Sequence, residues 1–166
     1  MELNRVFERI FPKGGEVVHA REISNVTLAK MRLASHPEAS AAALVKLSRH
    51  EWETIVVRVA ENSNTPHDVL SELAAHAHPD VRIALTENPN TPARVLILLA
   101  ADENADVRYG LADNHNTPLS VLSLLCDDEN PYVADRAGKT LSRIRQTRFK
   151  STGWFPFLRQ RQRDIG

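Results

Sequence analysis

The sequence predicts an all-α protein, an α-solenoid of about four to five two-helix repeats that are each 26 residues long. The tripeptide Asn-Thr-Pro occurs at 64–66, 90–92 and 116–118, so successive copies start 26 residues apart. Aliphatic residues keep the same spacing. The two clearest sets are Leu47, Leu73, Leu99 and Leu125, and Ile55, Val81, Val107 and Val133. No run of useful length alternates polar and apolar residues, so an array of strands is not expected.

The repeat divides the chain into units with two distinct ends. Complete units cover 39–64, 65–90, 91–116 and 117–142, and a degraded unit covers about 13–38. We therefore expect a solenoid domain over 1–142, with an N-terminal cap at about 1–24, and a basic, aromatic-containing extension over 143–166. One unit cannot bury its apolar face alone, so the units are expected to stack.

Each unit is expected to contain two short helices. In the unit 65–90, the Thr65 hydroxyl can cap the first helix and Pro66 then occupies the first helical position. The second helix covers about 80–87 and ends at Asn88, a residue type that tolerates the left-handed conformation. We expect these helix ends to recur in every complete unit that carries the same residues.

The most regular part of the repeat resembles a known family. The pattern Val-Arg-x-x-Leu-Ala-x-Asn-x-x-Thr-Pro-x-x-Val-Leu-x-x-Leu, which runs from Val107 to Leu125, is similar to the leucine-rich repeat variant family of HEAT-like repeats. The resemblance covers about 13–142 and implies short helices wound into a right-handed superhelix. The founding member of that family carries a cysteine-ligated iron–sulfur cluster. Cys126 is the sole cysteine here, so neither a cofactor nor a metal site is expected.

Polar residues also repeat at this spacing and indicate a structural ladder. Its expected members are Asp102, Asp128, Asn62, Asn88 and Asn114, together with Arg82 and Arg108 on the second helices. HEAT-like units use an acid and an arginine to tie turns to neighbouring helices, and buried charges are costly without partners. In the alternative interpretation, Arg82 and Arg108 offer a positive stripe to carboxylates or phosphates of a partner.

The second helices are expected to line a groove that binds a partner protein. Val57 shares its place in the repeat with three of the candidate contact residues. The candidates are Arg82, Ile83, Arg108, Tyr109 and Asp135. No motif for nucleophilic, phosphate-loop or zinc-protease chemistry is present, so we expect a scaffold or adaptor rather than an enzyme. A HEAT-like DNA-processing enzyme is the lesser alternative.

Charge is distributed in two opposed blocks, although Lys+Arg and Asp+Glu both number 21. Residues 139–166 hold eight basic residues and one acid, a net charge of +7, which leaves 13 basic residues and 20 acids, a net charge of −7, in 1–138. The zero net charge of the whole chain argues against a solenoid that binds nucleic acid through a basic surface.

The basic extension can cap the open end of the stack or bind a ligand. The candidate ligand-binding residues are Arg143, Arg145, Arg148, Lys150, Trp154, Phe155, Phe157, Arg159, Arg161 and Arg163. Arginines and aromatics together suit nucleic acid, an anionic membrane surface, or the acidic body of another copy, which would give self-association. A free thiol and the lack of a secretory signal or a membrane-length apolar run predict a cytoplasmic protein.

Overall fold

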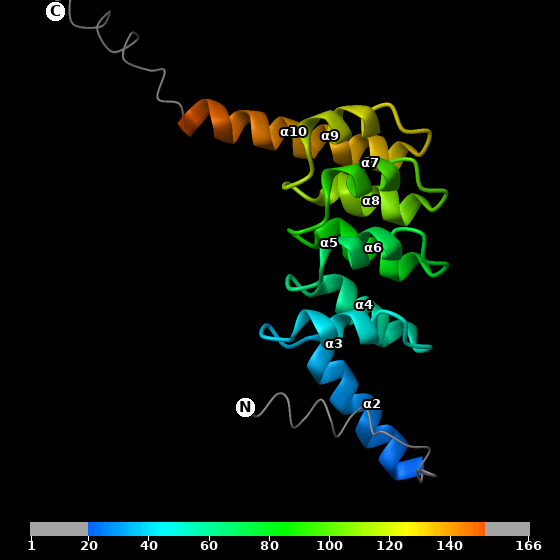
Figure 1. The fold of residues 1–166 in the computed structure, drawn as a ribbon. Helices are drawn as coiled ribbons and strands as arrows, with labels where there is room; N and C mark the ends of the chain where they lie inside the picture. Colours follow the sequence, from blue (N-terminus) through cyan, green and yellow to red (C-terminus); the bar gives the residue numbers. More distant parts are fainter. Residues whose placement is uncertain (1–19, 152–166) are drawn as a thin grey trace, which may run out of the picture.

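A computed structural model describes the backbone of residues 20–151 and the side chains of residues 25–147. The described chain is all-helical, with nine helices and no strand, as the sequence predicts (Figure 1). It begins with α2 (Ala20–Ala34). The first helices of the units are α3 (Ala41–Leu47), α5 (His67–Leu73), α7 (Ala93–Leu99) and α9 (Leu119–Leu125). The second helices are α4 (Glu53–Glu61), α6 (Pro79–Glu87), α8 (Ala105–Asp113) and α10 (Pro131–Ser151).

The helix pairs lie one above another in chain order (Figure 1). The second helices form the longest continuous contact, because α4 packs on α6, α6 on α8, and α8 on α10. Each first helix packs on the second helix of its own unit. This arrangement leaves one face made of second helices and two edges made of turns.

The predicted apolar sets form the core. Leu47, Leu73, Leu99 and Leu125 are all buried, and so are Ile55, Val81, Val107 and Val133. One buried cluster extends from Leu33 at the end of α2 to Ala137 in α10. Each 26-residue step therefore adds one layer to a continuous aliphatic core, and the predicted core positions are confirmed.

The N-terminal unit departs from the two-helix expectation. Residues 20–34 form one helix, which runs through the positions where the later units turn. The segment 22–26 has no proline, and Val26 stands at the place where His78 and Asn104 cap later second helices through their side chains, so no cap favours a second helix start there. The remaining part of the predicted cap, 1–19, lies outside the described residues.

The predicted boundary at 142/143 lies inside α10, which continues to Ser151. Leu141 is the last buried apolar residue of that helix. The described side chains beyond it are exposed, apart from Ile144, which is partly buried. Figure 1 shows α10 continuing past the end of the stack.

The asparagines hold adjacent units together rather than adopting a left-handed cap. Asn88 has φ −72° and ψ 120°, an extended conformation. Its side-chain amide donates to the Ala60 carbonyl at 2.6 Å and to the Asn62 carbonyl at 3.0 Å, both in the preceding unit. Asn62 donates in the same way to Ala34 and His36. Asn114 donates to Thr86. The expected left-handed conformation is therefore wrong, because the buried amide is used across the unit boundary.

The threonines also act at the opposite helix end from the one expected. The Thr65 hydroxyl donates to the Val59 carbonyl at 2.6 Å, at the end of α4, and makes no cap bond to α5. Pro66 occupies the N-cap position with ψ 146° instead of the first helical position. Thr91 and Thr117 donate to Leu85 and Leu111 in the same manner. Each hydroxyl thus donates to a carbonyl in the last turn of the preceding second helix, where carbonyls lack the full set of helical partners.

Candidate functional site

Arg82 and Arg108 are buried in ion pairs between units and do not form an exposed positive stripe. Arg82 donates to both carboxylate oxygens of Asp102, at 2.7 and 2.8 Å. Arg108 does the same with Asp128, at 2.8 and 3.0 Å. Each arginine also donates to backbone carbonyls of the turn in its own unit. The two arginines are 7% and 6% exposed, so their expected role as partner contacts is wrong.

These contacts keep both carboxyl groups ionised. Burial on its own would raise the pKa of Asp102, but hydrogen bonds from Arg82 and from the Asn104 amide lower that pKa below its ordinary value. The hydrogen bond from Arg108 lowers the pKa of Asp128 against the opposing effect of burial. The arginines and aspartates therefore neutralise each other inside the stack and leave little charge for a ligand.

The other expected contact residues do lie on the face of the second helices. Ile83 and Val57 are partly buried, and Tyr109 is 39% exposed. Asp135 is exposed on α10 and pairs with Lys139 one turn later, at 2.6 Å. This face therefore has a row of accessible apolar side chains that changes to a charged residue on α10.

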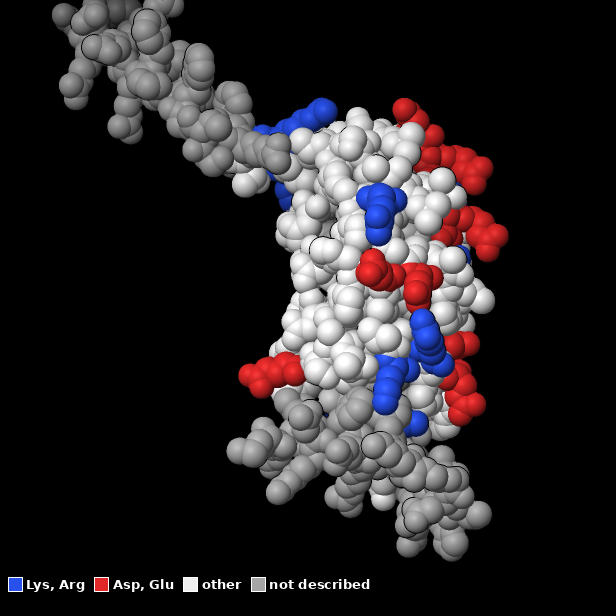
Figure 2. All heavy atoms as spheres, viewed as in Figure 1, with Lys and Arg blue, Asp and Glu red and all other residues white. Residues whose placement is uncertain are grey.

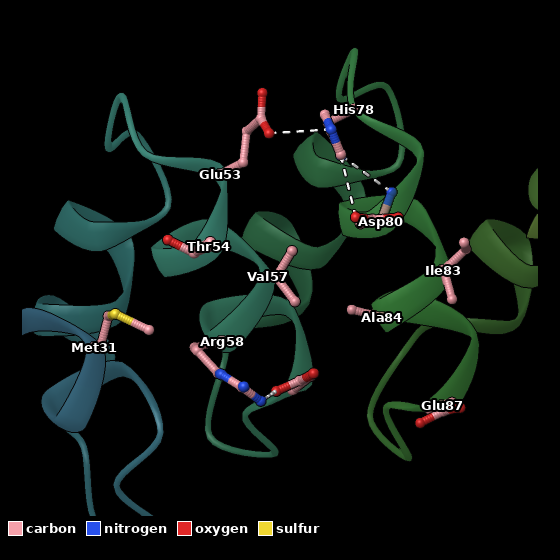
Figure 3. Close-up of a pocket in the computed structure, with 11 residues that line it drawn as sticks. Met31, Glu53, Thr54, Val57, Arg58, His78, Asp80, Ile83, Ala84 and Glu87 are labelled. Carbon is pink, nitrogen blue, oxygen red and sulfur yellow. Dashed lines mark hydrogen bonds and ion pairs between the residues drawn. The ribbon is translucent and has the colours of Figure 1, made fainter. Parts of the chain in front are cut away.

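A groove of about 430 Å³ lies on this face between α4 and α6. We call it the α4/α6 groove. Its lining residues are Met31, Glu53, Thr54, Val57, Arg58, Glu61, His78, Asp80, Ile83, Ala84 and Glu87. Figure 3 shows Val57, Ile83 and Ala84 in its middle, with charged residues toward both ends. The groove thus combines an apolar centre with polar ends, which suits an extended amphipathic segment.

The ends of the α4/α6 groove are predominantly acidic. Its lining contains four carboxylates and one guanidinium. At one end the His78 imidazole lies 3.0 Å from Glu53 and 3.7 Å from Asp80 (Figure 3). At the other end Arg58 pairs with Glu61 at 2.7 Å. Glu87 completes this end, and its carboxylate makes no hydrogen bond or ion pair with a side chain of residues 25–147.

Two intervals further along the stack, between α8 and α10, a side chain fills the space that corresponds to the α4/α6 groove. Arg136 of α10 lies over the Tyr109 ring, with its guanidinium carbon 5.9 Å from the ring centroid. The same side chain pairs with Asp113 of α8. In the interval between α4 and α6, the places of Tyr109 and Asp113 are held by Val57 and Glu61 of α4.

The residues at the place of Arg136 in earlier units explain why the groove stays open. In the interval between α4 and α6 the place is held by Ala84, and in the interval between α6 and α8 it is held by Gly110. Neither side chain can cross to the preceding helix as Arg136 does. The apolar row and the carboxylates of α4 and α6 are therefore left available to an arginine from outside the stack.

One edge of the stack is also acidic. The turns that join first to second helices, with the first turn of the second helices, carry the exposed acids Glu51, Glu53, Asp80, Glu103, Asp106, Asp127 and Glu129. Figure 2 shows acidic side chains gathered along one side of the stack. Several of these acids begin a second helix, where negative charge is favourable. We attribute the edge to helix stability, and to a general attraction for cationic partners.

The extension residues are only partly described. Arg143 and Arg145 are exposed on α10, and Arg148 and Lys150 lie on the same helix. Trp154, Phe155, Phe157, Arg159, Arg161 and Arg163 lie outside the described residues. Cys126 is partly exposed rather than fully buried, and it packs against the core.

Between residues 20 and 151, no helix is both long and apolar enough to cross a bilayer. In the same part of the chain, no three His, Cys, Asp or Glu residues are grouped to hold a metal ion.

Comparisons of the chain with family models, curated proteins and solved structures give no match.

Proposed function

We propose that this chain is a non-enzymatic protein-interaction module that binds an extended segment of a partner in the α4/α6 groove. The observation that supports this function is the combination of an apolar middle, at Val57 and Ile83, with ends that hold four carboxylates against one guanidinium. A matching ligand carries apolar side chains and arginine or lysine at short spacing. The resemblance to HEAT-like repeats and a cytoplasmic location belong to the same proposal.

The contact of Arg136 with Tyr109 and Asp113 provides an internal example of this chemistry. In the α4/α6 groove the equivalent places are held by Val57 and Glu61 of α4, so a ligand arginine over Val57 would lie beside Glu61, with Glu87 of α6 also lining the groove. The groove is open to solvent at its ends, so its ion pairs are screened by salt. We therefore expect weak, reversible binding that becomes weaker as ionic strength rises.

The test uses fluorescently labelled synthetic peptides in which arginine alternates with leucine or phenylalanine. A second set with glutamate in place of arginine controls for simple hydrophobic adsorption. We compare the full chain with Glu87→Lys in the groove and with Asp68→Lys on α5, which makes the same charge change on an exposed first helix.

The proposal expects the arginine peptides to bind the unmodified chain and the Asp68→Lys variant alike. Glu87→Lys should weaken binding at least about fivefold, the scale of one exposed charge contact reversed in sign. Equal loss in both variants would show a general electrostatic effect. No binding by any peptide would remove the α4/α6 groove from consideration.

A further inference from the structure

Resting on this proposed function, we infer that the occupant of the α4/α6 groove is the C-terminal segment 152–166 of a second copy of this chain. The inference names the partner that the groove chemistry describes in general terms. Three observations support it: the composition of the segment, the charge of the groove, and the distance between the two within one molecule.

The segment has the residue types that the groove requires. Trp154, Phe155, Phe157 and Leu158 form an apolar run, and Arg159, Arg161 and Arg163 follow at every second position. Asp164 is the sole acid in 152–166, so the segment carries a net charge of +2. The groove offers an apolar middle and an excess of three carboxylates over guanidinium groups. Aromatic residues suit the middle, and the arginines suit Glu87 and the other end residues.

The segment cannot place its aromatic run in the groove of its own chain. Asp135 of α10 corresponds to Ile83 in the repeat, and Ser151 is 16 residues further along α10. At about 1.5 Å per helical residue, Ser151 lies about 24 Å along the helix from that point. Counted from α10, the next second helices in the stack are α8, α6 and α4. The groove between α6 and α4 is therefore about 25 Å from α10, at about 10 Å per helix. The direct distance from Ser151 to the groove is then about 35 Å.

An extended chain covers at most about 3.4 Å per residue. Phe157 is six residues beyond Ser151 and reaches at most about 20 Å from it. Trp154 and Phe155 reach less far. Figure 1 shows that α10 continues beyond the stacked helices, so the end of this helix lies away from the groove. A groove on a second molecule has no such limit, and this is why we assign the segment to a neighbouring copy.

Such a contact joins two different surfaces and is head-to-tail. Each molecule presents one groove and one segment, so the association can extend to further copies unless its geometry closes a ring. Because the contact depends on charge, it weakens as salt rises. The assembly therefore grows with protein concentration and dissolves at high ionic strength.

The test is sedimentation velocity on the full chain over a range of concentrations, at low and high salt. The groove variant is Glu87→Lys, and the tail variant combines Arg159→Glu with Arg161→Glu. Asp68→Lys serves as the matched surface control. The decisive sample is an equimolar mixture of the groove variant and the tail variant, since each retains the one surface that the other lacks.

We expect the unmodified chain and Asp68→Lys to self-associate at low salt. The groove variant and the tail variant should each associate at least about fivefold more weakly, and their mixture should form dimers that do not extend further. Circular dichroism of each variant checks that the helices remain intact.

Three outcomes would overturn the inference. The unmodified chain could remain monomeric at every concentration, or the tail variant could associate like the unmodified chain. The tail variant alone could lose association while the groove variant keeps it, which would place the segment elsewhere. If the arginine peptides still bind the groove in any of these cases, the proposed function stands and only the partner is wrong. Retention of the unmodified monomer on heparin or anionic vesicles, lost in the tail variant, would assign the segment to a polyanion instead.

Discussion

Arg82 of one unit and Asp102 of the next form a bidentate ion pair, in which the guanidinium donates to the two carboxylate oxygens at 2.7 and 2.8 Å. Their side chains are 9% and 7% exposed. The interval one repeat earlier has Val56 and His76 at the same two places. His76 keeps the turn contact, because its ring accepts from the His78 amide as Asp102 accepts from Asn104. The chain thus forms this interface with an arginine and an aspartate in one interval, and with a valine and a histidine in the interval before it.

We predict that Asp102→Asn lowers the free energy of unfolding by about 3 kcal/mol, because it leaves the buried Arg82 charge without a counterion. The double replacement Arg82→Val with Asp102→His copies the pair found one repeat earlier and should recover most of that loss. Urea unfolding followed by circular dichroism measures both variants. A double variant that is less stable than Asp102→Asn would contradict the interchangeability of the two pairs.

Acid should weaken the stack through the same carboxyl groups. Hydrogen bonding lowers the pKa of Asp128, so on acidification the unfolded chain takes up this proton before the folded chain does. The stabilisation by Asp128 is therefore present above the ordinary carboxyl pKa and is lost as the pH falls through the folded-state value. We expect the unfolding free energy to fall between about pH 5 and pH 2, with a shallower fall in Asp128→Asn. Urea titrations at several pH values measure the two slopes, and parallel slopes would contradict the assignment.

The asparagine contacts should be as important as the ion pairs. Asn88→Ala removes two donors to carbonyls of the preceding unit and the acceptor of the Asn90 amide. A buried group left without its hydrogen bond costs about 1–3 kcal/mol, so we expect a loss of about 2–4 kcal/mol. Asn116→Ala is the control, since the exposed Asn116 side chain makes no hydrogen bond with the described residues 25–147. Equal stability of the two variants would argue against the ladder.

The 26-residue spacing predicts the helix positions and the core because each unit repeats one set of buried residues. The pairing of Arg82 with Asp102 was harder to predict. The six-residue spacing of Asp102 and Arg108 draws attention to contacts within a unit, whereas the carboxylate partner lies 20 residues away in the next unit. The sequence did contain a signal for this pairing. At its place in the repeat, arginine first appears at Arg82 in the unit 65–90, whereas aspartate first appears at its own place at Asp102, one unit later.

The repeat alone does not predict the α4/α6 groove, although it does predict that the second helices form the face on which the groove lies. The opening of the groove depends on Ala84, which stands at the place in the repeat where α10 carries the longer Arg136. Periodicity shows which residues share a place, but the size of the space follows from side chains that reach across to another helix. The helix ends were predicted wrongly for the same reason, because Thr65 and Asn88 satisfy carbonyl groups outside the helix that they border.

The two helical glycines in the described stack should respond in opposite ways to alanine. A Cβ on Gly110 would lie 2.7 Å from the Thr86 hydroxyl oxygen. Thr86 is 1% exposed and donates to the Ile83 carbonyl at 2.8 Å, so it has little room to move. A Cβ on Gly138 meets no atom within 4 Å.

We therefore predict that Gly110→Ala destabilises the chain by about 1–3 kcal/mol through overpacking, while Gly138→Ala stabilises it by about 0.5–1 kcal/mol through lower entropy of the unfolded chain. Adding Thr86→Ala to Gly110→Ala should relieve the clash and restore part of the loss, which separates overpacking from any general intolerance at this position. Thermal and urea unfolding measure all three variants. If Gly110→Ala stabilised the chain as Gly138→Ala does, α6 and α8 would not approach as closely as the structure shows.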